Sequence, residues 1–252
     1  DDDDGDDGDD DRPRAPQPPE DPPPRERDPD CAYPADASPA IRLGEVMPRL
    51  AWNRSFTGRG DVIDFDFEDV YCDPSWDRYK ILIFAVGTTW CPYCPSYFRT
   101  VHAMAPQLEE WGAKVIFVES QNNQGRPITN RDTFIYLQRL LGEGDDVRVG
   151  GGETRPRPSM IAQAEFLTGF PTSFVVRTRD MRFITHQGLM TGRGLLPFLA
   201  IAQNPDLDWS TPSEAPDIPS TCEADEEEEY EPNNTPWQAA DLDGPVEFEG
   251  GI

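Results

Sequence analysis

Two cysteines separated by two residues carry the most evident chemistry of this sequence. Cys91 and Cys94 enclose Pro92 and Tyr93 and form a C-P-Y-C motif. One helical turn of spacing brings two sulfurs close enough to form a disulfide and to open it again. We expect Cys91 to attack a substrate disulfide as a thiolate and form a mixed disulfide. Cys94 would then attack Cys91 and release the reduced substrate.

The residues on either side of the motif predict how the two cysteines are held. The apolar run 81–86 precedes the motif and predicts a strand that is buried on both faces. Apolar residues recur at helical spacing from Cys94 to Trp111. Cys91 is therefore expected at a helix N-terminus, where free N–H groups and the helix dipole stabilise a thiolate. Pro106 lies inside this helix and predicts a kink or a break, because it lacks an N–H.

Strands and helices alternate along the rest of the body, which predicts an α/β sandwich. The expected strands are 81–86, 115–118, 174–176 and 182–185, with a short strand at 147–149 inside the Gly/Pro-rich loop 142–158. The expected helices, besides the one after the motif, are 131–141, 159–167 and 195–202.

Three further cysteines, Cys31, Cys72 and Cys222, have no close pair between them and do not fit a zinc pattern. In an oxidising compartment Cys31 and Cys72 could form a structural disulfide, and the chain-entropy model gives such a loop about 4 kcal/mol. Cys222 is an alternative partner for either cysteine. In a reducing cytosol all three would be free thiols. We expect no metal and no cofactor.

Several short motifs follow one another in a fixed order. They are the G-E-V-M-P-R-L segment 44–50, the segment 61–70, the W-C-P-Y-C motif 90–94, the segment 131–149, the G-F-P-T-S-F segment 169–174, and Gly188. Together they resemble the thioredoxin-like superfamily, and most closely the TlpA/ResA-type extracytoplasmic thiol–disulfide oxidoreductases. The resemblance covers roughly residues 41–204. It implies an α/β, thioredoxin-like domain at 31–204 with a central mixed sheet flanked by helices. In this domain 61–70 would be the N-terminal strand and a turn, and 131–149 would be the helix–strand insertion of the TlpA type.

The resemblance also implies how a substrate binds. Pro171 would follow a cis peptide bond and lie across from Cys91, which leaves a backbone edge free beside the sulfur. Phe170 could then pair its main chain with an extended substrate strand. Trp90 would form a wall of the active site, and Pro92 and Tyr93 would contact the partner protein.

Some residues depart from the family pattern. Plain thioredoxin has a buried acid six residues before its first cysteine, where this sequence has Ala85. Glu119, at the end of the expected strand 115–118, is the candidate proton acceptor for Cys94. The Pro-Tyr pair resembles glutaredoxin, although no glutathione site is evident. Pro95, directly after the motif, is unusual for the family.

Two other functions stay open at this point. A peroxiredoxin-like thiol peroxidase would use the Thr88–Cys91 spacing, but Phe84 stands where that motif needs a proline. A non-catalytic, copper-binding or structural module would use a histidine near the C-P-Y-C pair, either His102 or His186. Neither histidine has a sequence context typical of a metal ligand.

The net charge of −26 over 252 residues is concentrated at the two ends. Residues 1–30 contain 14 acids and four arginines, and residues 205–252 contain 15 acids and no lysine or arginine. We expect a disordered tether at 1–30, an acidic linker at 205–231, and at 232–252 a tail or the start of a truncated β-domain. The E-P-N-N-T segment at 231–235 resembles the opening of the bacterial pre-peptidase C-terminal domain.

Partners and location follow from the same distribution of charge. The sequence has no basic patch for nucleic acid and no run of about 20 apolar residues for a membrane span. The Asp/Gly-rich beginning resembles the tether after the lipidated cysteine of bacterial lipoproteins, so a lipid anchor would lie upstream of residue 1. We expect an extracytoplasmic, monomeric bacterial protein that exchanges disulfides with protein thiols and with an upstream redox partner.

Overall fold

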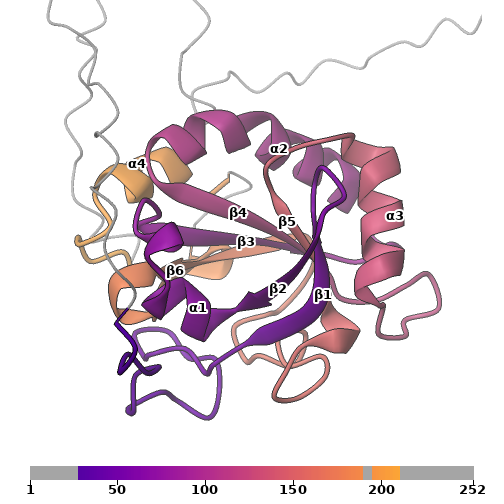
Figure 1. Ribbon diagram of the computed structural model, residues 1–252. Helices are drawn as coiled ribbons and strands as arrows, with labels where there is room; N and C mark the ends of the chain where they lie inside the picture. The colour runs from indigo at the N-terminus through magenta and orange to yellow at the C-terminus, as the bar shows by residue number, and fades with distance from the viewer. Residues whose placement is uncertain (1–27, 190–194, 211–252) are drawn as a thin grey trace, which may run out of the picture.

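A computed structural model describes residues 28–189 and 195–210 (Figure 1). The strands are β1 (Ala51–Thr57), β2 (Val62–Asp66), β3 (Ile81–Gly87), β4 (Ala113–Glu119), β5 (Val147–Gly150), β6 (Thr172–Arg177) and β7 (Arg182–His186). The α-helices are α1 (Phe67–Cys72), α2 (Cys94–Glu110), α3 (Asn130–Leu141) and α4 (Phe198–Gln203). Short 3₁₀ helices are at Pro74–Trp76, Gly151–Glu153, Thr178–Asp180 and Gln187–Leu189.

The strands of the described residues form one mixed sheet in the order β2-β1-β5-β4-β3-β6-β7. β3, β4 and β5 run parallel, joined by crossovers through α2 and α3, and the outer strands pair antiparallel with their neighbours. Parallel strands need such crossovers, which place helices on the faces of the sheet. The expected mixed sheet flanked by helices is therefore confirmed.

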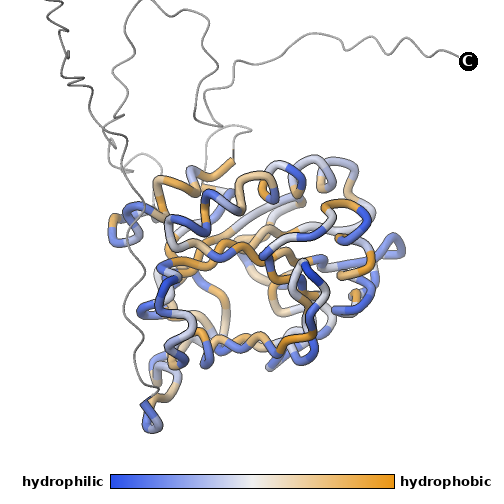
Figure 2. Tube along the Cα trace, turned by 45° about the horizontal axis from the view of Figure 1, so that its top comes forward, coloured by the Kyte–Doolittle hydropathy of each residue, from blue (hydrophilic) through white to orange (hydrophobic). Residues whose placement is uncertain are grey.

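Each face of the sheet has its own hydrophobic core. Residues of α2, α3 and α4 pack on one face against Ile81, Ile83, Ala85 and Phe117, and we call this cluster the α2-side core. Residues of α1 and of the segments before β1 and β6 pack on the other face, which we call the α1-side core. Figure 2 shows hydrophobic chain concentrated in the middle strands and hydrophilic residues around them. All seven residues of β3 are buried, as expected of a central strand.

The arrangement of β3, α2, β4, β6, β7 and α4 is thioredoxin-like. A parallel β3-α2-β4 unit is followed by the antiparallel pair β6-β7 and a final helix, and β3 lies between β4 and β6. In this fold the turn between β3 and α2 lies at the carboxyl end of a central strand. The C-P-Y-C motif therefore lies at the carboxyl end of a central strand, where ligands usually bind in α/β sheets.

Three expected elements differ from the structure. The expected helix at 159–167 is wrong: this segment forms only turns, and Ser159 at its start has a positive φ of 60°, which a helix does not accommodate. α4 begins at Phe198 rather than at residue 195, because Pro197 disfavours helical geometry in the residue before it. α2 continues from Cys94 to Glu110 without a break at Pro106.

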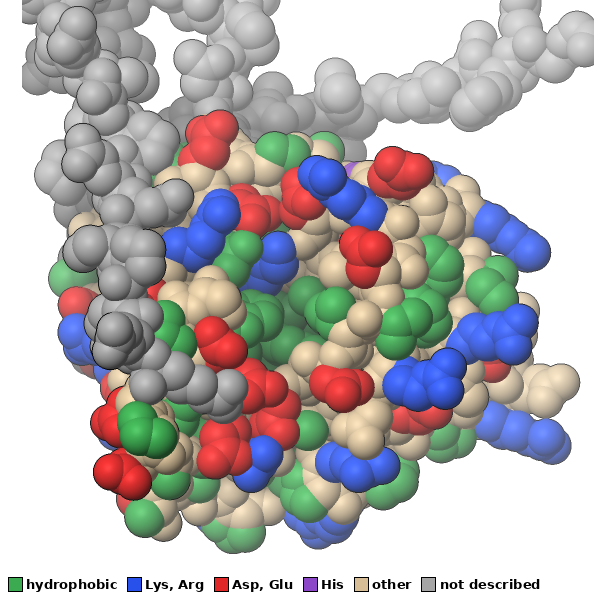
Figure 3. All heavy atoms as spheres, in the orientation of Figure 1, with side chains coloured by type: hydrophobic (Ala, Val, Ile, Leu, Met, Phe, Trp, Pro, Cys, Tyr) green, Lys and Arg blue, Asp and Glu red, His purple; other side chains and the backbone are tan. Residues whose placement is uncertain are grey.

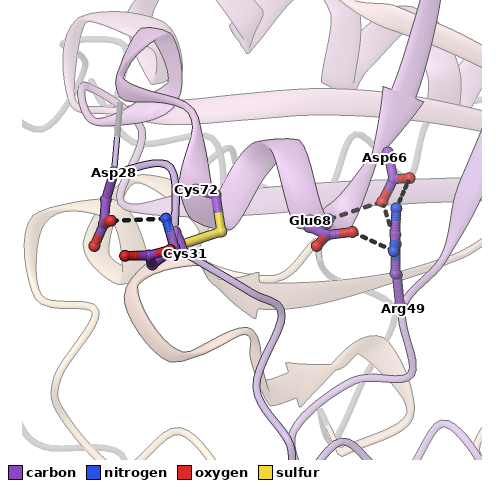
Figure 4. Close-up of a disulfide and its surroundings, with 7 residues drawn as sticks. Asp28, Cys31, Arg49, Asp66, Glu68 and Cys72 are labelled. Atoms are coloured by element: carbon purple, nitrogen blue, oxygen red, sulfur yellow. Dashed lines mark hydrogen bonds and ion pairs between the residues drawn. A yellow bond between two sulfur atoms is a disulfide. The ribbon is translucent and has the colours of Figure 1, made fainter. Parts of the chain in front are cut away.

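The segment 61–70, expected as a strand and a turn, is strand β2 followed directly by helix α1. Asp66 caps this helix by accepting a hydrogen bond from the backbone N–H of Glu68 at 2.8 Å. Arg49 binds the same Asp66 carboxylate with two nitrogens, at 3.0 and 2.7 Å, and also pairs with Glu68 (Figure 4). The local contacts therefore form a helix where the sequence suggests a turn.

A disulfide joins Cys31, in the segment before β1, to Cys72, the last residue of α1 (Figure 4). The two Cα atoms are 5.7 Å apart, and the residues are 41 positions apart in the sequence. The Tyr33 hydroxyl nearby donates to the Met47 carbonyl at 2.8 Å. These contacts fix the N-terminal part of the described chain onto the α1-side core. Cys222, the expected tether at 1–30 and the expected tail lie wholly or largely outside the described residues.

Candidate active site

Cys91 and Cys94 are joined by a disulfide at the turn between β3 and α2, with Cα atoms 5.5 Å apart. Cys91 retains 3% of its surface exposed, and Cys94 is fully buried. Both cysteines are buried, and the small exposed surface that remains belongs to Cys91. The exposure of the pair therefore differs in the direction that exchange chemistry requires, with an outer and an inner sulfur.

Cys91 lies one turn before α2 and not at its first residue, which corrects the sequence-based expectation. A helix that began at Cys91 would need the N–H of residue 95 to bond the Cys91 carbonyl, and Pro95 has no N–H. The N–H of Cys94 bonds that carbonyl instead, at 3.4 Å, and the N–H of Cys91 bonds the Thr88 carbonyl at 3.1 Å. Two successive tight turns therefore hold Cys91, and Pro92 precedes the helix.

Gly87, the last residue of β3, provides the space into which Cys94 fits. A Cβ atom at this position would lie 3.1 Å from Cys94 Sγ and 2.7 Å from Phe98 Cζ. Cys94 thus packs directly against the backbone of the central strand. This close approach explains why the inner cysteine has no exposed surface.

The loop before β6 reaches the same place from the other side. The Phe170–Pro171 peptide bond is cis. In the antiparallel register Val86 pairs with Thr172, so one further step brings Pro171 opposite Gly87. The proline loop lies opposite Gly87, and Cys94 packs against Gly87. Both therefore lie at the same end of β3.

Aromatic side chains surround the disulfide. Trp90 is 49% exposed and Tyr93 is 72% exposed. The Trp90 ring meets the Phe170 ring edge-on, with centroids 5.9 Å apart and planes at 87°. Pro92 is also exposed. Exposed aromatic side chains of this kind are enriched where proteins bind one another.

Glu119, the last residue of β4, is fully buried, and neither carboxylate oxygen has a hydrogen-bond partner in the described chain. Burial raises the pKa of this carboxyl to about 8. Glu119 pairs with Gly87 across the parallel β3–β4 register. Side chains alternate along a strand, so Glu119 points to the same face as Phe117, the face covered by α2.

Sequence reasoning missed two polar residues just beyond β4. Gln121 accepts a hydrogen bond from the Trp90 indole Nε1 at 3.0 Å. The buried hydroxyl of the neighbouring Ser120 has no hydrogen-bond partner among the described residues. A polar residue in a loop carries no sequence pattern that would single it out, so only the three-dimensional arrangement reveals these groups.

The histidines lie in settings that differ from a copper site. Nδ1 of His102 is 3.4 Å from the buried Asp146 carboxylate. His186 accepts a hydrogen bond from the Gly188 N–H through its Nδ1 and packs against Phe166. Within residues 28–189 and 195–210, no group of three or more His, Cys, Asp or Glu side chains could hold a metal ion. No helix in these ranges is long and apolar enough to cross a membrane.

No family model matches this sequence, and no curated protein matches it. Among solved structures, a thioredoxin from Wuchereria bancrofti is 17% identical, with 59% of this chain and 86% of that chain covered and a TM-score of 0.39. A putative thiol:disulfide interchange protein DsbE from Chlorobium tepidum is 16% identical, with 58% and 85% covered and a TM-score of 0.37. A Plasmodium vivax 2-Cys peroxiredoxin is 11% identical, with 64% and 79% covered and a TM-score of 0.42. The fold assignment itself rests on the strand order and helix placement described above.

Proposed function

We propose that this protein is a thiol–disulfide oxidoreductase that exchanges disulfides with other proteins through Cys91 and Cys94. The observation that carries the proposal is the placement of this pair. Cys91 is the outer sulfur in a tight turn, Cys94 is the buried sulfur against Gly87, and the Pro171 loop lies beside them. Among the functions considered, only reversible dithiol–disulfide exchange uses all of these features together.

The reaction can be written with all electrons and protons assigned. In the reduced protein the Cys91 thiolate attacks one sulfur of a substrate disulfide, and the other substrate sulfur leaves as a thiolate and takes up a proton. Cys94 then loses its proton and attacks the Cys91 sulfur, which forms the Cys91–Cys94 disulfide and releases the second substrate thiolate. Two electrons pass from the protein to the substrate, and the reverse sequence forms a substrate disulfide.

We assign Glu119 as the proton acceptor for the Cys94 thiol. An ordinary carboxyl, with a pKa near 4.3, is a poor match for a thiol with a pKa near 8.5. Burial raises the pKa of Glu119 to about 8, which brings the two groups close enough in acidity for a proton to pass in either direction. Glu119 thus takes the place of the acid that plain thioredoxin would have at Ala85.

The protein disulfide of a folded or unfolded polypeptide is the substrate class that fits the site best. Exposed Trp90 and Tyr93 offer aromatic contact area beside Cys91. The proline loop leaves the main chain of Phe170 to pair with an extended segment. An upstream dithiol protein would restore the reduced pair.

An extracytoplasmic location of the TlpA/ResA type completes the proposal. The Cys31–Cys72 disulfide supports an oxidising compartment, because structural disulfides persist there and are rare in the cytosol. The helix α3 and strand β5, which lie between β4 and β6 in the chain, support the proposed TlpA-type insertion. The protein would act there as a monomer.

Reduction of insulin by dithiothreitol tests the proposal. The wild-type protein should accelerate insulin precipitation, and Cys91→Ser should reduce the acceleration to the uncatalysed rate, because the attacking sulfur is gone. A Cys31→Ser/Cys72→Ser variant is the matched control, since it also lacks two sulfurs but keeps the C-P-Y-C pair. Equal activity in wild type and Cys91→Ser would refute the assignment.

A further inference from the structure

A compact loop lies beside the C-P-Y-C turn. We call residues 121–127 the Gln121 loop. Its ends are joined by the bridge between Gln121 and Pro127, and the Asn122 N–H bonds the Arg126 carbonyl at 2.8 Å. The Asn122 side chain accepts from the N–H groups of Gln124 and Arg126 at 2.9 and 3.1 Å. These bonds fix the loop's shape from within, although most of its residues are exposed.

Gln121 attaches this loop to the motif at two points. Its backbone carbonyl accepts from the Thr89 N–H at 3.0 Å, which holds the chain directly before Trp90. Its side-chain carbonyl accepts from the Trp90 indole N–H at 3.0 Å. The backbone of Gln121 therefore fixes the position of the chain before Trp90, and its side chain fixes the orientation of the Trp90 indole.

Trp90 also meets the proline loop. The edge-on contact with Phe170 leaves about half of the tryptophan surface open to solvent. A half-exposed indole without a partner for its N–H could adopt several rotamers. Here the hydrogen bond to Gln121 and the contact with the Phe170 ring together restrict the orientation of the indole.

We propose that Gln121 is a positioning residue that holds Trp90 as a preformed wall for polypeptide substrates, so that it favours protein disulfides over small disulfides. This inference rests on the proposed exchange function. A rigid aromatic contact improves binding because its ordering cost is met before the partner arrives. A small disulfide needs only the sulfur of Cys91 and gains little from the indole.

The expected effect has the size of one ordinary hydrogen bond. Its net strength corresponds to a roughly threefold to tenfold change in an equilibrium or rate constant. We therefore expect Gln121→Leu, which removes the acceptor but keeps much of the volume, to lower kcat/KM for insulin by about threefold to tenfold. The change should lie mainly in KM. The rate with hydroxyethyl disulfide should change by less than about twofold.

Conservative and double variants separate positioning from a general loss of structure. Gln121→Glu retains an oxygen that accepts from the Trp90 N–H and should restore most of the insulin activity. In a Trp90→Phe background, Gln121→Leu should add no further loss, because its effect passes through the indole. Gln124→Leu, at the exposed tip of the same loop, is the matched control and should keep the insulin-to-small-disulfide ratio of the wild type.

Two results would count against the proposal in different ways. An unchanged ratio in Gln121→Leu, or an equal loss in the Trp90→Phe background, would overturn the role of Gln121 and leave the exchange function intact. A wild-type protein that reduces neither insulin nor hydroxyethyl disulfide would instead overturn the exchange function itself.

Discussion

The two disulfides of the described chain differ in how far apart their cysteines lie in the sequence and in the residues that surround them. Cys31 and Cys72 join segments 41 positions apart and connect the beginning of the described chain to the end of a helix. Cys91 and Cys94 are three positions apart in a turn that tertiary contacts already hold in place. The first bond restricts a long loop in the unfolded chain, whereas the second restricts very little of it.

Their neighbours differ in the same sense. An ion-paired network of Arg49, Asp66 and Glu68 lies near the first disulfide (Figure 4). On the face of the molecule shown in Figure 3, acidic and basic side chains are interspersed around a hydrophobic centre. Exposed aromatic rings, a proline loop and a buried, unpaired carboxyl lie around the second. We therefore propose that the surroundings, more than the bond itself, make the first disulfide a structural cross-link and the second a reactive one.

Removal of the long-range cross-link should produce the largest change in stability. We expect Cys31→Ser/Cys72→Ser to lower the free energy of unfolding by about 4 kcal/mol, since a loop of roughly 42 residues is released. Insulin reduction per folded molecule should stay within about twofold of the wild type. Urea denaturation and the insulin assay on one preparation measure both quantities.

The short disulfide provides the reverse case. Its loop of four residues gives only about 2 kcal/mol by the same chain-entropy model. Cys91→Ser should thus lose all exchange activity with the smaller loss of stability. If Cys31→Ser/Cys72→Ser lost exchange activity while still folded, the first disulfide would not be purely structural, which would contradict this account.

Glu119→Gln should change how stability depends on pH. Because the folded protein holds the Glu119 proton up to about pH 8 and the unfolded chain releases it near pH 4.3, wild-type stability falls as pH rises between these values. The fall is about 1.4 kcal/mol per pH unit, and Glu119→Gln should not show it. Urea denaturation of both proteins at pH 5, 6, 7 and 8 measures the difference.

Asp146 supplies an internal control for this experiment. Burial alone would raise the pKa of its carboxyl, but the hydrogen-bonded Arg148 guanidinium and the neighbouring His102 ring outweigh burial and hold the pKa below the usual value. Its contribution is therefore present above the unfolded pKa and is lost only as pH falls through acidic values, equally in both variants. Parallel stability curves for wild type and Glu119→Gln from pH 5 to 8 would show that Glu119 does not retain its proton.

Gly87→Ala should disturb the packing around Cys94 while both cysteines remain in place. The added methyl would lie 2.7 Å from Phe98 Cζ and 3.1 Å from Cys94 Sγ. Overpacking of this kind costs about 2 kcal/mol, and it should also slow resolution of the mixed disulfide by displacing Cys94. Gly169→Ala, where a Cβ meets no atom within 4 Å, is the control. Equal rates of resolution in the two alanine variants would show that Cys94 does not depend on this close packing.

The sequence predicts the central elements well because their signals are local. The apolar run of β3 and the helical spacing of α2 reflect burial directly, and the C-P-Y-C motif stands between them. β1 is not predicted, because Arg54 has a positive φ of 55° and the register shifts between Trp52 and Ser55, which interrupts the alternation of a strand.

Contacts that join distant segments leave less trace in the sequence. Arg148 is fully buried and binds Asp146, Gln138 and the Gly142 carbonyl, yet a charged residue is normally expected at the surface. The contact of Gln121 with Trp90 is likewise a product of folding. The resemblance to a family predicts the position of the proline loop. No local sequence pattern predicts which residues hydrogen-bond each buried polar group.

Trapping of the mixed disulfide tests the central claim most directly. A Cys94→Ser variant, reduced and then mixed with a disulfide-bonded polypeptide, should form a covalent adduct through Cys91 that a reductant reverses, and Cys91→Ser should form none. Mass spectrometry of the intact adduct and of its peptides measures both. An adduct of equal yield in the two variants, or none in Cys94→Ser, would contradict the assignment of Cys91 as the attacking sulfur.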